Sequence, residues 1–401
     1  MLWPHSTFGA FLALYEGFWF IAASSGTTAA AATIAPKVVI VDFYNDEQNA
    51  WYGIPEFDLL AQNISVPGLS MRYPDAHCTQ DGFVCQIVTD EGEINAATTA
   101  LALVLSPSFN LTQTYFLLAG DGGISPKVGT IGSVTFARYA VQVALQYEFD
   151  AREKPANFST GYVPQGTTAL GAYPLYIYGT EVFELNDDLR QRAIQFAQQA
   201  SLNDTASAQA YRANYANVSD FAAATTAPSV IGCDTATSDV WWSGSLLGEA
   251  FENTTKLFTN GTGSYCSTQQ EDNSVLEALL RGAIARRVDF SRVMIMRTAS
   301  DFDRPYSGQD ASDNLFFGQD AGYDAAVLNI YLAGVKVVQG ILDGWNETFQ
   351  AGVKPSNYIG DILGSLGGAP DFGPGNAFNG AAPPPSQTSA VLLRRRRATA
   401  G

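Results

Sequence analysis

Short apolar runs alternate with amphipathic stretches along most of the chain. Four runs are rich in β-branched and aromatic side chains and are typical of buried strands: Lys37–Asp42, Phe83–Thr89, Tyr115–Ala119 and Val293–Met296. Apolar residues recur at helical spacing in several segments between them. This order predicts an α/β fold, with a central mixed, largely parallel sheet flanked by helices in a single large domain.

Four helices are expected. After the polar residues Asp90–Glu93, alanine, leucine and valine recur on one side of a first helix. Glu181–Ala200 is amphipathic and predicts a second. Thr268 and Glu271 match a capping box, in which Thr268 is the N-cap residue and Glu271 reaches back to it, so a third helix should follow. A last helix is expected from about Ala325 to Gly340.

Both ends of the chain differ from its body. Residues 1–25 are apolar and aromatic and give way to small residues, as in a secretory signal peptide. A positively charged start is missing and Glu16 interrupts the apolar run, so an uncleaved membrane anchor is the alternative. No other segment approaches ~18 uninterrupted apolar residues. After Gly367 the sequence is rich in Gly, Ala and Pro, which predicts a domain at 36–367 followed by a disordered tail at 368–401.

Composition and charge limit the partners. The chain has 401 residues, of which 46% are hydrophobic and 15% are charged, so it can bury a substantial core. The formal net charge is -17, and four of the 22 basic residues lie in Arg394–Arg397 alone. A body this acidic argues against binding nucleic acid or an anionic membrane, because both require basic patches.

Sequons and cysteines favour a secreted or cell-surface protein. Asparagine begins an N-x-Ser/Thr sequon at positions 63, 110, 157, 203, 217, 253, 260 and 346, which predicts a glycoprotein. Cys78 and Cys85 flank a short turn, and Cys233 and Cys266 bracket a glycine-rich loop, so these are the preferred disulfide pairs among three possible connectivities. The chain has only two histidines, and we expect no metal site and no cofactor.

Polar residues gather where the predicted strands end. The four segments are Asp90–Glu93, Gly120–Gly123, Thr237–Trp242 and Ser300–Asp303. In open α/β sheets ligands bind beyond the carboxyl ends of the strands, so these segments and the helix start near Glu271 should form a pocket. Asp301 is its central candidate. The alternative is that Asp301 only caps a turn before Pro305.

Several of these segments resemble a known fold family. The stretches LLAGDGGISPKVGT, TSDVWW, QQEDN and RTASDFD occur in the order found in nucleoside phosphorylases and nucleosidases. The blocks PKVVIVDFY, EGEINAATT, YGTEVFELND, MRTASDFDRP and KPSNYIGDILGSLG resemble more closely the purine nucleoside permease family. The resemblance spans about residues 36–367 and implies a nucleoside phosphorylase-like fold.

The resemblance also implies roles for individual residues. Asp301 matches the acid that protonates the purine at N7, which requires a pKa raised by burial. Ser300 would orient it. Asp272, or Glu271 if the alignment shifts by one, matches the group that holds the ribose hydroxyls. The remaining nucleoside-binding candidates are Gly120, Gly122, Trp241 and Trp242; the two tryptophans would stack on the base, or else belong to the core.

The departures from the phosphorylase pattern concern phosphate. Leu118 and Asp121 occupy the places where phosphorylases commonly have an arginine and a serine or threonine. Asp90 and Glu91 add two further carboxylates nearby. A carboxylate ~4 Å from a phosphate costs on the order of 1–4 kcal/mol, so inorganic phosphate would be a poor second substrate. Asp121 could instead hold and deprotonate a water molecule, which makes it the second catalytic candidate.

Three functional hypotheses remain. In the first, the protein binds a purine nucleoside and assists its uptake through a separate membrane transporter. In the second, it is a secreted enzyme that cleaves the N-glycosidic bond, as a hydrolase rather than a phosphorylase. In the third, it is a non-catalytic cell-surface glycoprotein. The sequence does not separate the first two, because the same pocket binds and cleaves, and it leaves homo-oligomer formation open.

Overall fold

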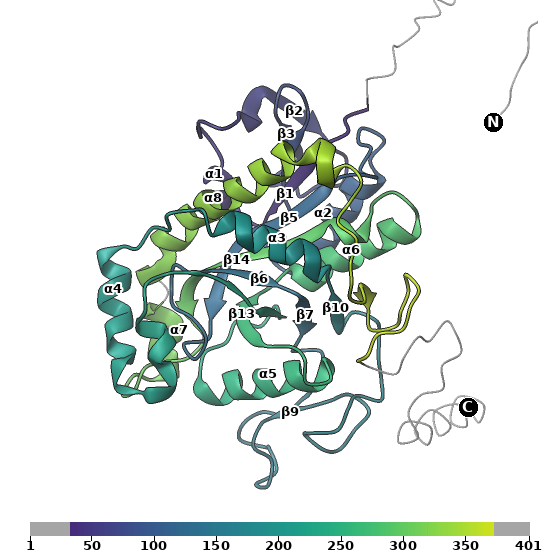
Figure 1. Ribbon diagram of the computed structural model, residues 1–401. Coiled ribbons are helices and arrows are strands. Elements are labelled where there is room, and N and C mark those ends of the chain that lie inside the picture. The colour runs from purple at the N-terminus through teal and green to yellow at the C-terminus, as the bar shows by residue number, and fades with distance from the viewer. Residues whose placement is uncertain (1–32, 319, 373–401) are drawn as a thin grey trace, which may run out of the picture. The chain divides into compact units, whose positions relative to one another are not determined.

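Thirteen strands of the part of the chain that the structure describes join in one mixed sheet with helices packed against it (Figure 1). The computed structural model describes residues 33–318 and 320–372. The predicted signal-like segment at 1–25 and residues 373–401 of the predicted tail lie outside the described residues. The expected α/β class, with a mixed sheet flanked by helices, is confirmed.

The centre of the sheet consists of four parallel strands in the order β4 (Val84–Val88), β1 (Val38–Asp42), β5 (Tyr115–Ile124) and β14 (Val293–Phe302). β1, β4 and β14 are buried at every position. Strands covered on both faces lack polar alternation, which is why they are visible in the sequence as continuous apolar runs. The predicted parallel pairing therefore describes the central strands.

β5 and β14 are longer than the sequence suggested. We expected them to end near Ala119 and Met296, but each continues as a paired strand to a total length of ten residues. Their pairing runs from Val293 opposite Phe116 to Phe302 opposite Ile124, with an irregularity between Ala299 and Asp301. Small residues permit this close approach, so the glycine-rich segment is an extension of β5 and not a loop.

The flanks of the sheet combine antiparallel pairs with parallel pairs. β3 (Asp75–Cys78) and β2 (Gln62–Ser65) extend it beyond β4. The other side holds β6 (Val134–Ala137), β7 (Tyr139–Gln142), β10 (Val182–Glu184), β11 (Val230–Gly232), β12 (Asp234–Thr237), β13 (Tyr265–Gln269) and β15 (Gly360–Asp361). Of these, β6–β11, β7–β12 and β12–β13 are parallel pairs. β8 (Tyr147–Glu148) and β9 (Tyr162–Val163) pair only with each other.

Helices cover both faces of the central strands. α2 (Glu93–Leu105) and α6 (Asp272–Ile284) pack together on one face, in a core that includes Val39 and Val41 of β1. α3 (Asp187–Ala197) and α8 (Asp320–Asp343) cover the other face, in a core that includes Val38 and Ile40. Successive side chains of β1 thus enter opposite layers, as the pleat of a strand requires. The other helices are α1 (Asn45–Asn49), α4 (Ala206–Arg212), α5 (Ser245–Phe258) and α7 (Ala311–Phe317), with short helical segments at 59–61, 213–217, 219–225, 290–292 and 345–349.

Three predicted helix starts are wrong. α8 begins at Asp320, five residues before the expected start at about Ala325. α3 begins at Asp187, six residues later than expected, with the Asn186 side chain accepting from the backbone N–H of Leu189. The predicted capping box at Thr268 does not form, because Thr268 belongs to β13 and α6 begins only at Asp272. There the Gln269 side-chain oxygen accepts from the backbone N–H groups of residues 271 and 272, at 2.7 and 2.8 Å. The buried Gln269 side chain, and not that of Thr268, thus satisfies the backbone N–H groups at the start of α6.

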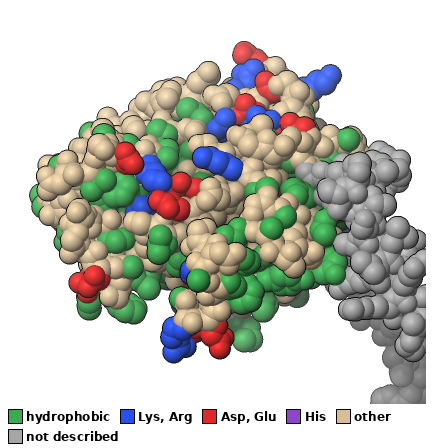
Figure 2. Space-filling view, turned by 90° about the horizontal axis from the view of Figure 1, so that it is seen from below, with side chains coloured by type: hydrophobic (Ala, Val, Ile, Leu, Met, Phe, Trp, Pro, Cys, Tyr) green, Lys and Arg blue, Asp and Glu red, His purple; other side chains and the backbone are tan. Residues whose placement is uncertain are grey.

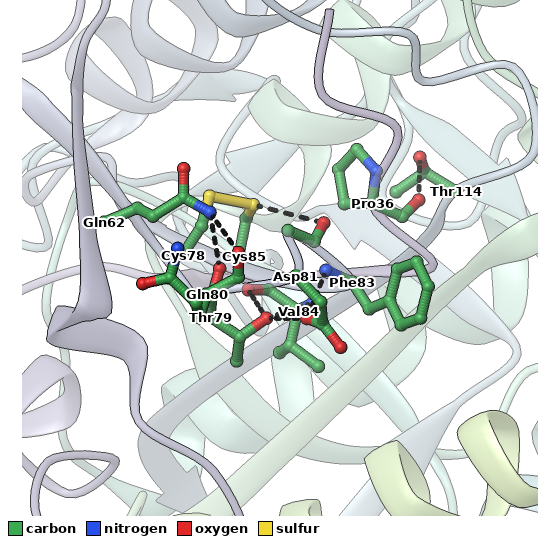
Figure 3. The surroundings of a disulfide bond; sticks show 11 residues. Pro36, Gln62, Cys78, Thr79, Gln80, Asp81, Phe83, Val84, Cys85 and Thr114 are labelled. Atoms are coloured by element: carbon green, nitrogen blue, oxygen red, sulfur yellow. Dashed lines mark hydrogen bonds between the residues drawn. A yellow bond between two sulfur atoms is a disulfide. The ribbon is translucent and has the colours of Figure 1, made fainter. Parts of the chain in front are cut away.

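The preferred disulfide connectivity is confirmed. Cys78 and Cys85 are directly paired residues of β3 and β4 and close the turn between these strands (Figure 3). Asp81 organises that turn by accepting from the Phe83 backbone N–H at 3.0 Å. Cys233 and Cys266 join the segments at which β12 and β13 begin. Each bond therefore ties together neighbouring strands of the sheet.

One helix of the described residues, Ala321–Asp343 within α8, is long and apolar enough to cross a membrane. However, 56% of its most apolar window is buried inside the fold, where α8 packs on β14 and α3. A core helix passes the same test of length and composition. This helix therefore gives only weak evidence for a membrane span.

Candidate functional site

A cavity of about 330 Å³ lies beside the ends of β5 and β14, next to the first turn of α6 and the segment 238–242. Most of the predicted site residues line it: Asp121, Gly122, Trp241, Trp242, Glu271, Ser300 and Asp301. Gly120 and Asp272 are predicted site residues that do not. Segments that are far apart in the sequence thus form one pocket, as expected for the carboxyl ends of strands in an α/β sheet.

Asp301 faces the cavity from the last part of β14. Ser300 Oγ lies 3.2 Å from Asp301 Oδ1 and 3.1 Å from the Gly122 carbonyl oxygen, so this hydroxyl helps to fix the carboxyl group. Burial, reinforced by the charge of Asp121, raises the pKa of Asp301 to about 7. The side chain therefore carries a proton for part of the time at neutral pH and can donate it.

Asp121 faces the same cavity from β5 and is held by two residues that follow β1. Tyr44 donates its hydroxyl hydrogen to Asp121 Oδ1 at 3.0 Å. The backbone N–H of Asp121 donates to Glu47 Oε1 at 2.8 Å. Glu47 lines the cavity as well, and burial together with the charge of Asp121 raises its pKa. Three carboxyl groups, those of Asp121, Glu47 and Asp301, thus share one cavity.

Among the residues that the structure describes, Arg297 is the only arginine or lysine that lines the cavity, and it lies four residues before Asp301 in β14. Its Nη2 donates to Asp272 Oδ1 at 2.7 Å and to Glu271 Oε2 at 3.1 Å, while its Nη1 donates to the Asp121 carbonyl oxygen at 3.0 Å. The guanidinium carbon lies 3.9 Å from the centre of the Phe43 ring. Because two carboxylates already neutralise this charge, Arg297 is not free to bind phosphate.

The two acidic residues at the start of α6 have different positions. Glu271 lines the cavity, accepts from the Gly92 backbone N–H at 3.2 Å, and has its pKa raised to about 7 by burial, against the opposing effect of Arg297. Asp272 is fully buried behind it, bound to Arg297. The structure thus corrects the placement of Asp272: Glu271, the alternative by one position, is the residue that can reach a ligand.

The predicted glycines and tryptophans also differ in how they contact the cavity. A Cβ on Gly120 would lie 2.6 Å from both Arg297 Nη1 and Glu47 Oε1, so Gly120 permits these two side chains to pack and does not itself contact the cavity. Trp241 is 57% exposed at the cavity wall and is free to stack on a ligand. Trp242 is buried, with its ring centre 4.6 Å from that of Phe251, so it combines a core position with a cavity contact.

Sequence reasoning missed several polar residues of the site, among them Tyr44, Glu47, Tyr323 and Arg297. The Tyr44 and Tyr323 hydroxyls are 3.1 Å apart, and Tyr323 donates to Asp46 at 2.7 Å. The signal for Tyr44 and Glu47 was their place directly after β1, where a ligand pocket is expected. Arg297 could have been recognised because an arginine in a buried strand requires an acidic partner.

The charge in the cavity is predominantly negative. Asp303 is neutralised by Arg304, whose Nε lies 2.8 Å from Asp303 Oδ1. Glu271 shares Arg297 with Asp272, and among the described residues the carboxyl groups of Glu47, Glu91, Asp121 and Asp301 form no ion pair. The lining therefore favours a neutral or cationic ligand over an anion. Among residues 33–318 and 320–372, no group of His, Cys, Asp and Glu has the arrangement of a metal site.

In sequence, the chain is similar to proteins named purine nucleoside permeases. The profile of the family "purine nucleoside permease (NUP)" matches residues 35–354. The purine nucleoside permease of Candida albicans (strain SC5314) is 43% identical over 347 residues, which is 85% of this chain and 84% of that protein. A probable purine nucleoside permease of Schizosaccharomyces pombe (strain 972) is 38% identical over 334 residues, which is 81% of this chain and 94% of that protein.

Among solved structures, the similarities are more distant. A 5'-methylthioadenosine/S-adenosylhomocysteine nucleosidase from Neisseria meningitidis has a TM-score of 0.43 at 12% identity, covering 76% of this chain and 99% of that one. The futalosine hydrolase of Helicobacter pylori has a TM-score of 0.43 at 13% identity, covering 77% of this chain and 97% of that one. At these values the comparison carries no conclusion about function.

Proposed function

Because the chain belongs to the purine nucleoside permease family, we propose that it binds a purine nucleoside in the cavity beside β5 and β14 and that this binding serves nucleoside transport. The observation that carries the proposal is the position of Asp301. It lies in a cavity large enough for a small ligand, and burial keeps it partly protonated at neutral pH.

A purine nucleoside matches the groups that line the cavity. The N7 atom of a purine is an acceptor, and a protonated Asp301 is a donor. The exposed ring of Trp241 offers a flat apolar surface for the base. Glu271 accepts hydrogen bonds and suits the ribose hydroxyls. A nucleoside also carries no phosphate, which fits the negative charge of the lining.

Transport requires a further component in this proposal. The candidate site lies in a folded α/β domain, and α8 is largely accounted for as a core helix of that domain. A separate membrane transporter would therefore receive the nucleoside, and the present chain would capture it outside the cell or at its surface. Export agrees with the presence of two disulfides. It also agrees with the exposure of the sequon asparagines, which are all exposed except the half-buried Asn203.

Isothermal titration calorimetry with adenosine, guanosine and inosine tests the proposal. We expect one site per chain, weakened strongly by Glu271→Ala, which removes hydrogen bonds to the ribose at a cost of about 1.5–3 kcal/mol. The matched control is Glu249→Ala, an exposed acidic residue on α5 that lies outside this cavity. If no nucleoside binds to the wild-type protein, the proposal fails and a non-catalytic glycoprotein is the better hypothesis.

Hydrolysis of the N-glycosidic bond is the second candidate function. It is favoured by the combination of a partly protonated Asp301 with the carboxyl groups of Asp121 and Glu47 in one cavity. Water would attack the anomeric carbon as the bond to the purine breaks. Asp121 would take the proton of that water, and Asp301 would give its proton to the departing base. Because Arg297 is already neutralised, water suits the site better than phosphate does.

Chromatography separates binding from cleavage. Purified protein is incubated with inosine, with and without inorganic phosphate, and free hypoxanthine is measured. A hydrolase releases the base equally in both, and Asp301→Asn should lower the rate by about 10²–10⁴-fold while inosine still binds, because an amide can donate a hydrogen bond but not a proton. Binding without any release of base leaves transport as the function and excludes hydrolysis.

A further inference from the structure

A second cavity lies outside the nucleoside site, between α5 and the residues around β9. Its volume is about 460 Å³. Helix α5 contributes one wall, and residues 159, 160, 162, 170 and 171 contribute the other. α5 and β9 lie at the same end of the molecule (Figure 1), and Figure 2 views the molecule from that end. Nothing in the proposed nucleoside mechanism uses this cavity.

Asn253 lines the second cavity and begins a sequon, Asn253-Thr254-Thr255. The residue is exposed on α5, and its side-chain amide makes no hydrogen bond within the described residues. Asn63 and Asn260, in two other sequons, donate hydrogen bonds to Asp75 and to the Asp371 carbonyl oxygen. The amide of Asn253 is thus available for modification, and a group attached to it would begin in the cavity.

Thr255, the third residue of that sequon, has a hydroxyl that the fold does not use. Its side chain is fully buried, and Oγ1 has no hydrogen-bond partner in the part of the chain that the structure describes. The neighbouring Thr254 Oγ1 donates to the Ala250 carbonyl oxygen at 3.1 Å and accepts from Gln146 Nε2 at 3.0 Å. Valine has the same shape as threonine and would fill this position without burying an unpaired hydroxyl. Packing therefore does not explain threonine here, but the sequon does, because the unfolded chain requires a hydroxyl at this place to be glycosylated.

The lining of the second cavity suits a carbohydrate. Ser159 and Thr160 present hydroxyls on the side opposite α5, while Glu249 and Lys256 present charged groups on α5. Sugars offer many hydroxyl groups that donate to and accept from such side chains. Leu246 and Leu257 add apolar surface of the kind that the ring carbons of a sugar can cover.

From the free amide of Asn253, the unused hydroxyl of Thr255 and the polar lining, we propose that Asn253 carries an N-linked glycan whose first sugars lie in the second cavity. The glycan would bridge α5 to the segment around β9. Within the described residues, β8 and β9 pair only with each other and not with the main sheet, so the glycan would add a contact that holds this segment. The inference rests on the proposed export, because only the secretory pathway attaches this glycan.

Enzymatic deglycosylation tests the buried position of the glycan. The protein is secreted from a eukaryotic host behind a foreign signal peptide, so that the test does not depend on residues 1–25. Site occupancy is measured by mass spectrometry of glycopeptides. We expect the Asn253 glycan to be released at least tenfold more slowly from native protein than a glycan on the exposed Asn346, and equally fast after denaturation. An unoccupied Asn253, or equal release from native protein, overturns the proposal.

Thr255→Val gives a second, independent readout, because its effect should change sign with glycosylation. In protein made in a bacterial strain that permits disulfide formation, it removes an unpaired buried hydroxyl and should raise Tm by about 2–4 °C. In the secreted protein it also removes the glycan and should lower Tm. Thr255→Ser keeps the sequon and is the control for the lost methyl contacts. A rise in Tm in both proteins contradicts the proposal.

Export is tested separately by secretion behind the native residues 1–25. Failure of these residues to direct secretion would refute export alone.

Discussion

Arg297 and Asp272 form an ion pair that is almost completely removed from solvent, with Arg297 Nη2 2.7 Å from Asp272 Oδ1. The two side chains are 2% and 0% exposed. The same guanidinium binds Glu271 at the wall of the cavity. Because a buried charge is costly without a partner, each of these residues depends on the others. The pair thus fixes the start of α6 against β14 and sets the position of Glu271.

The first prediction is that Arg297→Met lowers the free energy of unfolding by about 3–5 kcal/mol, because it leaves two buried carboxyl groups without a cation. The matched control is Arg281→Met, which breaks the 2.6 Å pair with Glu277 on the surface of α6, where the arginine side chain is 65% exposed. The control should lose less than about 0.5 kcal/mol. Urea denaturation followed by tryptophan fluorescence measures both, and similar losses would show that the buried pair has no special role.

The sequence revealed the parts of the fold that have strong local signals. The central strands were predictable because burial on both faces leaves continuous apolar runs, as in Lys37–Asp42. Asp121 and Asp301 were predictable as site residues because they follow such runs. Local pattern did not show that β5 and β14 continue through them, because pairing over a glycine-rich segment depends on the partner strand.

The residues that sequence reasoning missed depend on tertiary contacts. Glu47 has the local pattern of a polar loop residue, and only the approach of β5 brings it to Asp121. Thr268 has a good local capping pattern, but it belongs to β13, and its pairing with Ala236 of β12 overrides that preference. The sequence also could not decide which of Glu271 and Asp272 faces the cavity, because this depends on the side from which Arg297 approaches.

The second prediction concerns stability as a function of pH. Burial raises the pKa of Asp301 from 3.8 to about 7, so between these values the folded protein binds more protons than the unfolded chain. The contribution of Asp301 to stability is therefore fully present below about pH 4 and is lost as the pH rises through 7. Asp301→Asn has no proton to lose. Its stability relative to wild type should rise by up to roughly 4 kcal/mol between pH 4 and pH 8. Urea denaturation at both pH values measures this, and a constant difference would exclude a raised pKa.

The third prediction is that inosine binding weakens above pH 7. A protonated Asp301 donates to the purine, so deprotonation removes the donor and places a negative charge beside an acceptor atom. Calorimetry at pH 6, 7 and 8.5 should show a nearly constant Kd at the lower values and a loss approaching tenfold per pH unit above them. Asp301→Asn is the control and should bind with little pH dependence. The same slope in wild type and variant would assign the effect to another group.

The fourth prediction distinguishes the two disulfides. Cys233 and Cys266 are 33 residues apart and Cys78 and Cys85 only 7, so the first bond restricts the unfolded chain more. Replacing both cysteines of a pair by alanine should cost about 4 kcal/mol for Cys233–Cys266 and about 2 kcal/mol for Cys78–Cys85. Denaturation of the two double variants under identical conditions measures the difference. A larger loss for Cys78–Cys85 would mean that local packing around the turn outweighs chain entropy.

The last prediction concerns the close approach of two strands below the cavity. A Cβ on Gly122 would lie 2.1 Å from the Thr268 carbonyl oxygen, and a backbone atom of β13 cannot move aside without moving the strand. Gly122→Ala should therefore lower the free energy of unfolding by about 1–3 kcal/mol and also weaken nucleoside binding, because Gly122 and Thr268 line the same cavity as Asp121 and Glu271. Gly171→Ala is the matched control, since nothing lies within 4 Å of the added atom on that exposed residue, and it should alter neither quantity. Calorimetry and urea denaturation of both variants test the claim. A stable Gly122→Ala protein that binds inosine like wild type would show that β5 and β13 can separate freely, and that the tight strand contact does not shape the site.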